Sequence, residues 1–440
     1  CAAAYAANPY ALLIIYMRSD FAEQLAMAFF PLLALAALEV LRLVQNPHRS
    51  TGRCIAFLAF IFAAVWLANA PAAVLASYSM PAIFLFSAIT EKRWRPLLHG
   101  GAGLALGLGL AGFYLAPAIH EQSWVNITQA LASGLQPSQN FLYSVIADAE
   151  HNAFNRIASN TAVLMISLTA IFAAATFPRH SKESAPHFSK PVWNLLALLL
   201  ALSAFLMLPI SNVFWIVLPK LRFVQFPWRW MSILTIPFAC LFAAAMSKKN
   251  LRWYWIALST AALATVLAGT AAWMIGHAWW DTEDIPVLLE AVRNDEGFEG
   301  VDEYDPAGDD HSELPEKYPR MKLLRAAPSS SVIAGARIHV EHWSAEIKEM
   351  RVTAREPSRL ALRLLNYPAW SVEVNDQGVT PERLGESGQM IVPLASGQSH
   401  IVVRFLRTSD RTIGAVVTAL SLLILILLLI IRPHDAPQND

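Results

Sequence analysis

The feature that most constrains this chain is a series of apolar runs, each long enough to cross a lipid bilayer. A hydrocarbon core of about 30 Å requires roughly 20 helical residues. Runs of this length occupy 21–44, 96–118, 160–178, 192–210, 228–247, 252–275 and 412–431. The apolar stretch 53–90 is interrupted at Asn69-Ala70-Pro71, which predicts two shorter helices, 54–69 and 71–90, with Pro71 in the first turn of the second. The pattern predicts a polytopic α-helical membrane protein with about nine transmembrane helices.

Composition supports this fold class and excludes several others. Of the 440 residues, 15% are charged and the mean hydropathy is +0.42, whereas soluble domains carry about 25% charged residues. A net charge of zero gives no reason to expect a nucleic-acid partner. The chain has no GxxxxGK[ST] phosphate-binding loop, so ATP is not expected as a partner, and no CxxC or HExxH, so no structural zinc site is expected and no residue is assigned as a metal ligand. The expected partner is the lipid bilayer.

Basic residues in the connections predict the orientation of the spans, because Lys and Arg are retained on the cytoplasmic side. Four connections carry them: Arg42, Arg49 and Arg53; Lys92, Arg93 and Arg95; Arg179, Lys182 and Lys190; Lys248, Lys249 and Arg252. With nine spans, all four fall on one side. The segments 1–20, 119–159, 211–227 and 277–411 are then exoplasmic and the C-terminus is cytoplasmic.

The long segment 277–411 divides into two parts. From Asp281 to Glu316 there are fourteen acidic residues and one basic residue, so 277–331 is interpreted as an acidic exoplasmic connection. From 332 to 411, short alternating runs are separated by Gly- and Asn-containing turns, which predicts a small exoplasmic β-sandwich. The predicted organisation is a membrane bundle over 1–276, these two segments, and a C-terminal transmembrane helix over 412–432.

The first candidate site is at the start of span one, where Arg18, Asp20 and Glu23 lie close to membrane depth. Charges there are costly and are candidates for function. In the functional interpretation, Arg18 binds a phosphate and Asp20 or Glu23 is a catalytic carboxylate. The alternative is that these are interfacial residues marking the helix start, with Asp20 as its N-cap.

The second candidate site is the connection before the span 228–247. Its expected substrate-binding residues are Lys220, Arg222, Gln225, Trp228 and Arg229. Three cations on a face that the positive-inside rule depletes require anionic partners, and a guanidinium suits a phosphate. The alternative for Trp228 and Trp230 is an aromatic belt at the membrane interface.

The third candidate is the polar loop 119–159, which is long for a connection between spans. Asp148 and His151 are expected to contact substrate there, through acid–base chemistry or ligand binding. No metal-ligand spacing is met, and a solvated loop is the alternative.

In the order of its motifs, the chain resembles the bacterial family labelled 6-pyruvoyl-tetrahydropterin synthase-related membrane domain, which is similar to YfhO-like proteins and to the wider GT-C glycosyltransferase superfamily. The motifs are Tyr16-x-Arg18 with Glu23, Asn69-Ala70-Pro71, Phe113-Tyr114-Leu115-Ala116-Pro117, Gln225-Phe226-Pro227-Trp228-Arg229, Gly300-Val301-Asp302-Glu303-Tyr304-Asp305-Pro306 and Tyr367-Pro368-Ala369-Trp370. Nothing in the sequence points to pterin chemistry.

The resemblance implies a GT-C-like glycosyltransferase of the bacterial inner membrane, which transfers a sugar from a polyprenyl-phosphate donor to an exoplasmic acceptor. A divalent cation is compatible with such chemistry. GT-C enzymes place a catalytic carboxylate in their first exoplasmic loop, and the first residue, Cys1, suggests that this loop lies upstream of the chain. The alternative functions are a non-catalytic transporter of lipid-linked glycans and a cell-envelope assembly scaffold.

Overall fold

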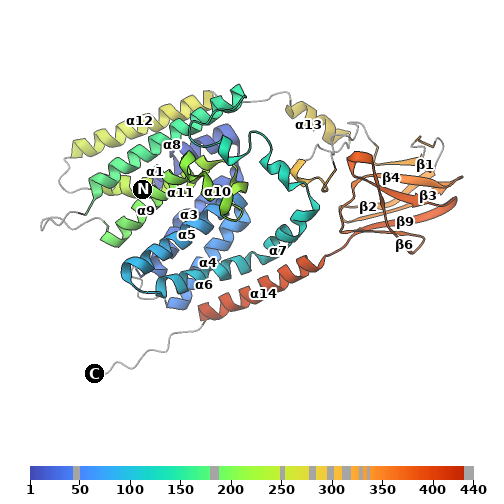
Figure 1. Ribbon diagram of the computed structural model, residues 1–440, viewed down its shortest axis with the longest axis horizontal. Helices are drawn as coiled ribbons and strands as arrows, with labels where there is room; N and C mark the ends of the chain where they lie inside the picture. Colours follow the sequence, from blue (N-terminus) through green and yellow to red (C-terminus); the bar gives the residue numbers. More distant parts are fainter. Residues whose placement is uncertain are drawn as a thin grey trace, which may run out of the picture. The chain divides into compact units, whose positions relative to one another are not determined.

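A computed structural model describes residues 1–42, 50–178, 188–247, 253–276, 284–294, 302–309, 319–326, 331–333 and 337–430. The chain forms two compact units. Unit 1 comprises Cys1–Leu115, Leu131–Trp279 and Ala415–Asp440, and unit 2 comprises Ala116–Ala130 and Trp280–Gly414 (Figure 1). Of the basic residues that predicted the orientation, Arg49, Arg179, Lys182, Lys248, Lys249 and Arg252 lie outside the described residues.

Unit 1 is built from helices. Its long helices are α3 (Phe21–Val40), α4 (Thr51–Ala68), α5 (Ala70–Glu91), α6 (Arg95–Leu110), α8 (Ala149–Thr176), α9 (Lys190–Leu206), α11 (Met231–Met246), α12 (Trp253–Gly276) and α14 (Ser409–Ile430), of which the first residues of α14 belong to unit 2. Shorter pieces of unit 1 are α1 (Ala2–Ala6), α2 (Pro9–Leu13), the π-helix η1 (Ile14–Arg18), η4 (Pro137–Gln139), η5 (Pro209–Ser211), α10 (Asn212–Val217), η6 (Leu221–Val224) and η7 (Pro227–Trp230). Two short helices, α7 (Gly112–His120) and η3 (Ile127–Leu131), belong partly to unit 1 and partly to unit 2.

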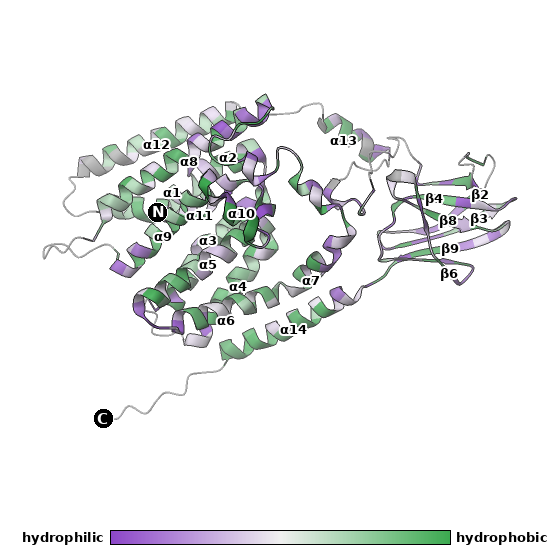
Figure 2. Ribbon diagram, viewed as in Figure 1, coloured by the Kyte–Doolittle hydropathy of each residue, from purple (hydrophilic) through white to green (hydrophobic). Residues whose placement is uncertain are grey.

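Among the described residues, six helices are long and apolar enough to cross a membrane: α3, α4, α5, α8, η7 with α11, and α14. Two bent pairs raise this number to eight: α6 with α7 and η2 (Glu121–Trp124), bent by 75°, and α9 with η5 and α10, bent by 90°. The described residues thus contain six to eight candidate spans where nine were predicted. Each predicted run coincides with helix, and α12 covers the run 252–275. Green, apolar ribbon dominates these helices in Figure 2.

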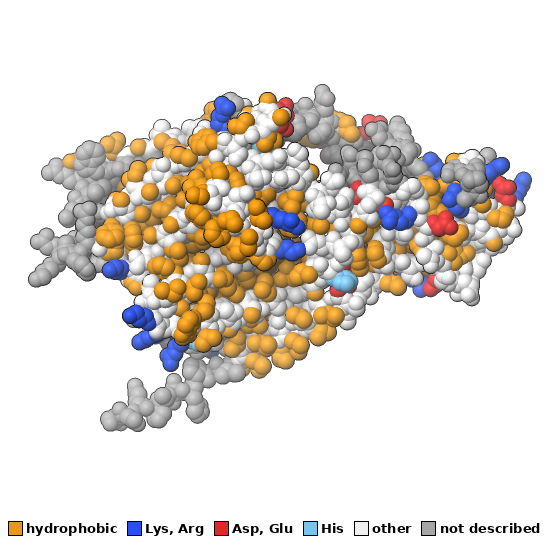
Figure 3. All heavy atoms as spheres, in the orientation of Figure 1, with side chains coloured by type: hydrophobic (Ala, Val, Ile, Leu, Met, Phe, Trp, Pro, Cys, Tyr) orange, Lys and Arg blue, Asp and Glu red, His pale blue; other side chains and the backbone are white. Residues whose placement is uncertain are grey.

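The outer surface of unit 1 is also apolar. Orange side chains cover most of its visible face in Figure 3. Large side chains such as Phe21, Leu98 and Ile89 are about two-thirds exposed. Apolar exposure on this scale is typical of a surface that faces lipid. The chain is a multi-pass membrane protein by the composition of its helices.

Two segments interpreted as connections are more helical than the hydropathy pattern predicted. The segment 1–20, interpreted as a connection, contains α1, α2 and η1, and its Tyr10, Leu13 and Ile14 are fully buried. Helix α8 begins at Ala149, before the predicted start at 160, because Asp148 caps it and Asn155 is buried on its polar turns. A search for apolar runs misses helical turns of this kind.

The break in the stretch 53–90 has the predicted local cause. Asn69 ends α4, and its side chain then accepts a 2.9 Å hydrogen bond from the amide of Ala72 as the N-cap of α5. Pro71 lies in the first turn of α5, where its missing N–H costs nothing. The two-helix prediction is confirmed.

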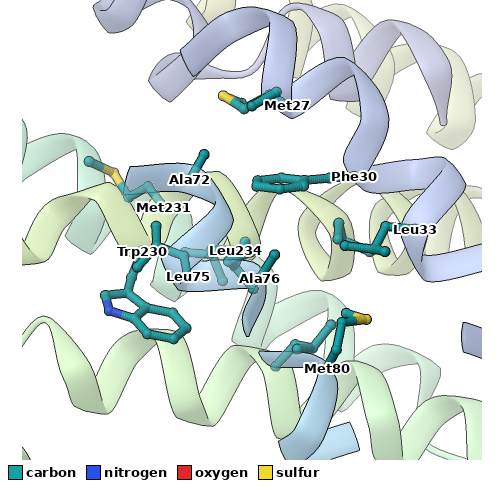
Figure 4. Close-up of a cluster of buried hydrophobic side chains, with 14 of the residues drawn as sticks. Met27, Phe30, Leu33, Ala72, Leu75, Ala76, Met80, Trp230, Met231 and Leu234 are labelled. Atoms are coloured by element: carbon teal, nitrogen blue, oxygen red, sulfur yellow. The ribbon is translucent and has the colours of Figure 1, made fainter. Parts of the chain in front are cut away.

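The core of unit 1 lies between α3, α5 and α11. Figure 4 shows Met27 and Phe30 of α3 facing Leu75 of α5, and Trp230 and Met231 completing the cluster. All are essentially inaccessible to solvent. The core therefore packs the N-terminal part of α3 against the N-terminal part of α11. The residues of the first two candidate sites lie next to these two helix ends.

Helix α6 packs closely on its neighbours through glycines, because small residues let membrane helices approach one another. A Cβ on Gly103 would lie 2.7 Å from the Leu58 side chain, and a Cβ on Gly107 would lie 2.8 Å from the carbonyl oxygen of Ala59. Helix α14 also packs on α6, where Thr418 Oγ1 donates to the carbonyl of Gly109 at 3.3 Å.

Unit 2 contains two antiparallel sheets before the final apolar helix. The strands are β1 (Met321–Arg325), β2 (Arg337–Trp343), β3 (Ile347–Ala354), β4 (Ser358–Leu365), β5 (Trp370–Val374), β6 (Gln377–Val379), β7 (Glu382–Leu384), β8 (Gln389–Leu394) and β9 (Gly397–Phe405). Their orders are β1-β4-β8-β7 and β2-β3-β9-β5-β6. Buried residues of both sheets, such as Leu360 and Val403, form one apolar core. The unit also contains η2, α13 (Asp284–Arg293), η8 (Asp302–Tyr304) and η10 (Gly385–Ser387).

Replacing Gly107 by Ala is expected to destabilise unit 1 by about 1–3 kcal/mol, because the added methyl group meets backbone rather than a movable side chain. Thermal unfolding in one detergent, followed by tryptophan fluorescence, measures the effect. Gly101→Ala is the matched control, since no atom lies within 4 Å of its Cβ and Ala favours helix. Equal melting temperatures for the two variants would contradict the close α4–α6 packing.

Candidate functional site

The structure brings the first two sequence clusters together into one network of ion pairs. Arg18 Nη1 lies 3.1 Å from Glu23 Oε2 and 3.4 Å from Asp20 Oδ2. Arg229, about two hundred residues further along the chain, places Nε 3.2 Å from Glu23 Oε2 and Nη2 3.4 Å from Asp20 Oδ2. Each carboxylate therefore contacts both guanidinium groups. These four side chains form the ion-pair network, and its formal charge is zero.

The ion-pair network has a buried side and a more open side. The Glu23 side chain is 0% exposed and that of Arg229 is 6% exposed, whereas Arg18 and Asp20 are 16% and 17% exposed. Removing such charges from water costs several kcal/mol per ion unless each is paired. Glu23 and Arg229 are thus held by their partners, and Arg18 and Asp20 form the side that solvent or a ligand can reach.

Local backbone chemistry places the first three residues of the network. The π-helix η1 ends at Arg18, and Ser19 then adopts a left-handed conformation with φ of 53°. Asp20 follows as the N-cap of α3 and accepts a 2.9 Å hydrogen bond from the amide of Glu23. The predicted capping role of Asp20 is confirmed, and Asp20 also takes part in the network. Both carboxylates lie at the helix N-terminus, where negative charge is favoured.

Aromatic side chains surround the two guanidinium groups. The Arg18 guanidinium lies 5.4 Å from the ring centroid of Phe226 and 5.0 Å from that of Trp228. That of Arg229 lies 5.2 Å from Phe226. Phe226 and Trp228 are themselves stacked at 4.9 Å. Cation–π attraction of this kind holds the cations without adding charge.

Tyr10 is a network member that the sequence patterns missed. Its hydroxyl donates to Glu23 Oε1, and its ring contacts Trp228 edge to face. Asn8 caps α2 by accepting from the amides of Tyr10 and Ala11, both at 3.0 Å, and Pro9 follows it. The Asn8-Pro9 pair was the available signal, since it is typical of a helix start, but it does not indicate which partner Tyr10 finds.

The connection that carries Arg229 contains unusual backbone. Gln225 has φ of 67° and ψ of −53°, and the amide of Phe226 donates to the carbonyl of Val224 at 2.7 Å. This is the rare, strained form of the γ-turn. Arg229 Nη1 donates to the same carbonyl at 3.0 Å and so supports the turn from inside. Such strain, of order 1–3 kcal/mol, is found preferentially at functional sites.

Lys220 and Arg222 lie on the same connection and are exposed. Their charged groups lie 5.4 Å and 5.0 Å from the ring centroid of Phe223. Tyr78 of α5 donates to the carbonyl of Pro219 at 2.6 Å and fastens this end of the connection to the bundle. Because the ion-pair network is neutral, these two cations give the connection its net positive charge.

The aromatic-belt alternative does not fit the two tryptophans. Trp228 and Trp230 are 1% and 0% exposed and lie inside unit 1 rather than on its lipid-facing surface. Both indole nitrogens are buried without a hydrogen-bond partner among the described residues.

In the third sequence cluster, Asp148 and His151 make hydrogen bonds that stabilise the local structure. Asp148 is the N-cap of α8 and accepts from the amides of Glu150 and His151, both at 3.0 Å. His151 Nε2 lies 2.9 Å from Asn140 Oδ1. Asp148 and the Nε2 atom of His151 thus have hydrogen-bond partners. The Nδ1 atom of His151 is buried without a partner among the described residues.

Within the described residues, the one group of three side chains spaced for a metal ion is Glu341, Glu349 and His400 on neighbouring strands. His400 Nε2 lies 2.9 Å from Glu349 Oε1, and Arg351 Nε lies 2.7 Å from Glu341 Oε1. The contact with Arg351 accounts for the Glu341 charge without a metal.

Comparisons with protein-family models, curated proteins and solved structures return no match to this chain. The resemblance drawn from the sequence motifs thus stays a prediction, and the functional argument depends on the geometry above.

Replacing Glu23 by Gln is expected to destabilise unit 1 by about 3–5 kcal/mol, since it leaves the buried Arg229 guanidinium to share one carboxylate, Asp20, with Arg18. The measurement is thermal unfolding in a fixed detergent. Glu91→Gln, at an exposed position at the end of α5, is the control and should change little. If the two variants have the same melting temperature, the ion-pair network does not stabilise the fold.

Proposed function

We propose that this protein is a membrane-embedded glycosyltransferase of the GT-C type. It takes a sugar from a polyprenyl-phosphate donor and transfers it to an acceptor on the exoplasmic face of a bacterial inner membrane. The observation that carries the proposal is a buried, charge-neutral network whose open side, Arg18 and Asp20, lies on the same bundle as the exposed cations Lys220 and Arg222.

The charges suit a lipid phosphate. Arg229 is already neutralised by Glu23 and Asp20, so its first role is to hold the site together. The exposed cations Lys220 and Arg222 attract an anionic donor, and Arg18, with its partly open guanidinium, can bind two phosphate oxygens. Apolar helices next to the site suit the polyprenyl chain.

The two carboxylates differ enough to take different roles. Glu23 is fully buried and contacts Arg18, Arg229 and Tyr10, which is the environment of a positioning residue. Asp20 is partly exposed and its two ion pairs are longer, at 3.4 Å. Asp20 is therefore the better base. In the proposed step, an acceptor hydroxyl attacks the anomeric carbon, its proton passes to Asp20, and the bond from that carbon to the phosphate oxygen breaks.

A second function is favoured by one observation. Both carboxylates are engaged by guanidinium groups, as expected of a site that only holds a headgroup. A non-catalytic transporter of lipid-linked glycans, or a cell-envelope assembly scaffold, would use the same cations for binding alone. Donor binding without transfer distinguishes this function from the first.

Asp20→Asn is expected to lower sugar transfer by about 10²–10⁴-fold. It should destabilise unit 1 less than Glu23→Gln does, because Asn also caps helices and the Asp20 ion pairs are longer and partly exposed. Transfer is measured as incorporation of radiolabelled sugar from polyprenyl-phosphate donors in membranes with and without the protein.

Arg222→Gln should raise the donor KM in the same membranes with little change in kcat, and Arg293→Gln on α13 should change neither. If the Asp20→Asn variant transfers sugar as fast as the native protein, Asp20 is not the base. Donor binding with no protein-dependent transfer would favour the transporter or scaffold, and absence of both would refute the proposed function.

We also retain the predicted topology, in which the two sheets form a β-sandwich within an exoplasmic segment 277–411 and the C-terminus is cytoplasmic. Reporter fusions at residues 140 and 300 are expected to be active only for an exoplasmic reporter, and fusions at 50 and 185 only for a cytoplasmic one. The opposite result at any of these positions would contradict the span order that the basic residues predict.

A further inference from the structure

Unit 2 contains a pocket of about 510 Å³ that the proposed transfer step does not use. It lies where η2, η8, the start of β5, the end of β9 and the first turn of α14 meet. Backbone hydrogen bonds fix its wall: the amide of Asn126 donates to Asp305 and that of Ala307 donates to Trp124, both at 2.8 Å. The volume is within the usual range for small-molecule sites.

Aromatic rings dominate the lining of this pocket. They are the side chains of Trp124, Tyr304, Tyr367, Trp370 and Phe405. Tyr304 is 60% exposed, and the other four are partly buried. Leaving aromatic surface in water is unfavourable, and a ligand that covers the rings would recover that free energy.

Two of the rings are held by neighbouring cations. The Arg411 guanidinium lies 4.7 Å from the centroid of Phe405, and the Lys348 ammonium lies 4.3 Å from that of Trp370. The Tyr367 hydroxyl donates to the carbonyl of Tyr304 and so fixes η8 beside the pocket. Burial, and next the charge of Asp305, raise the pKa of Tyr367, so its phenol remains a neutral donor at physiological pH.

The charged groups in the lining exclude an anionic ligand. The cation in the lining is Arg411, and it is held bidentately by Glu121, with Nε to Oε1 at 2.8 Å and Nη2 to Oε2 at 3.1 Å. Glu346, the second lining carboxylate, is exposed, and its side chain makes no hydrogen bond or ion pair to another described residue. The pocket therefore offers acceptors and a surplus of negative charge.

A saccharide combines the two properties that such a pocket requires. The C–H face of a pyranose is apolar and packs on aromatic rings, while its hydroxyls donate hydrogen bonds to carboxylates. An acyl chain would leave Glu346 and the Glu121–Arg411 pair without any role, and a phosphate or uronic acid would face the Glu346 charge.

We infer that the aromatic pocket of unit 2 binds an uncharged saccharide, with Trp124 and Tyr304 packing on the sugar faces and Glu346 accepting from its hydroxyls. The inference goes beyond the proposed transfer reaction, because binding requires no activity of unit 1. Arg411 is in the first turn of α14, whose apolar sequence continues as a candidate span. The pocket is thus at the end of unit 2 from which the chain enters the bilayer.

The test is binding by the purified protein in lipid nanodiscs free of sugar-headed detergent. Saturation-transfer NMR and calorimetry are run with chitotetraose, cellotetraose, mannotetraose and, as the anionic comparison, tetragalacturonate. At least one neutral tetrasaccharide should bind with a Kd of about 1 mM or tighter. Tyr304→Ala, which keeps the backbone acceptor of Tyr367, should weaken it about tenfold or more, and Glu346→Gln should also weaken it.

Trp343→Ala is the matched control, since this partly buried tryptophan of β2 does not line the pocket, and it should leave binding unchanged. Circular dichroism confirms that each variant is folded. The inference is overturned if no neutral tetrasaccharide binds at this strength, if Tyr304→Ala and Trp343→Ala have equal effects, or if dodecanoate displaces the sugar. Asp20→Asn should still bind the sugar, so failure of the transfer proposal is distinguishable from failure of this one.

Discussion

The pairing of Glu23 with Arg229 is the interaction on which the membrane unit depends. A fully buried carboxylate and an almost fully buried guanidinium are tolerated only because each neutralises the other. Their contact joins the start of α3 to the start of α11, across most of the sequence of unit 1. The apolar cluster around Phe30, Leu75 and Trp230 packs α3, α5 and η7 against one another. Charge pairing and apolar packing thus fix the same junction.

The backbone around this junction departs from regular structure at three places. The chain enters α3 through a π-helix and a left-handed Ser19, and it enters η7 through the strained turn at Gln225. Regular helices would not direct Arg18 and Arg229 toward the same two carboxylates. The aromatic pair Phe226 and Trp228 then covers the guanidinium groups. The strain is therefore offset by the contacts that it permits.

Unit 2 also combines an ion pair with aromatic residues, but in a different arrangement. Its Glu121–Arg411 pair is partly exposed and bidentate, and it lies beside aromatic rings that keep some of their surface in solvent. In unit 1 the aromatic side chains are buried against the cations and form core, whereas in unit 2 they line a cavity. The two proposals therefore assign different ligands to the two units: a lipid phosphate to the ion-pair network with the exposed cations Lys220 and Arg222, and a neutral sugar to the aromatic pocket. A transferase that acts on lipid-linked sugars would use both kinds of recognition.

The sequence correctly predicted the features that depend on local interactions. Runs of apolar residues predicted the helices of unit 1, Asn69 and Pro71 predicted the break before α5, and Asp20 was correctly expected as a helix cap, because each depends on neighbours within a few residues. The described residues contain six to eight candidate spans where nine were predicted, and hydropathy did not reveal the sharp bends after Leu110 and Leu206. The polar turns of α8 and the helices before Phe21 were missed because they are not part of a long apolar run.

Sequence alone named Arg18, Asp20, Glu23 and Arg229 as candidates, since charged residues near membrane depth are rare. It placed them in two separate clusters and offered no sign that Tyr10 joins them. Only the tertiary structure decided that the two clusters form one neutral network, that Trp228 and Trp230 are core rather than interface, and that Asp148 caps a helix. These outcomes depend on contacts between residues far apart in the chain, which burial and charge pairing select and local patterns do not encode.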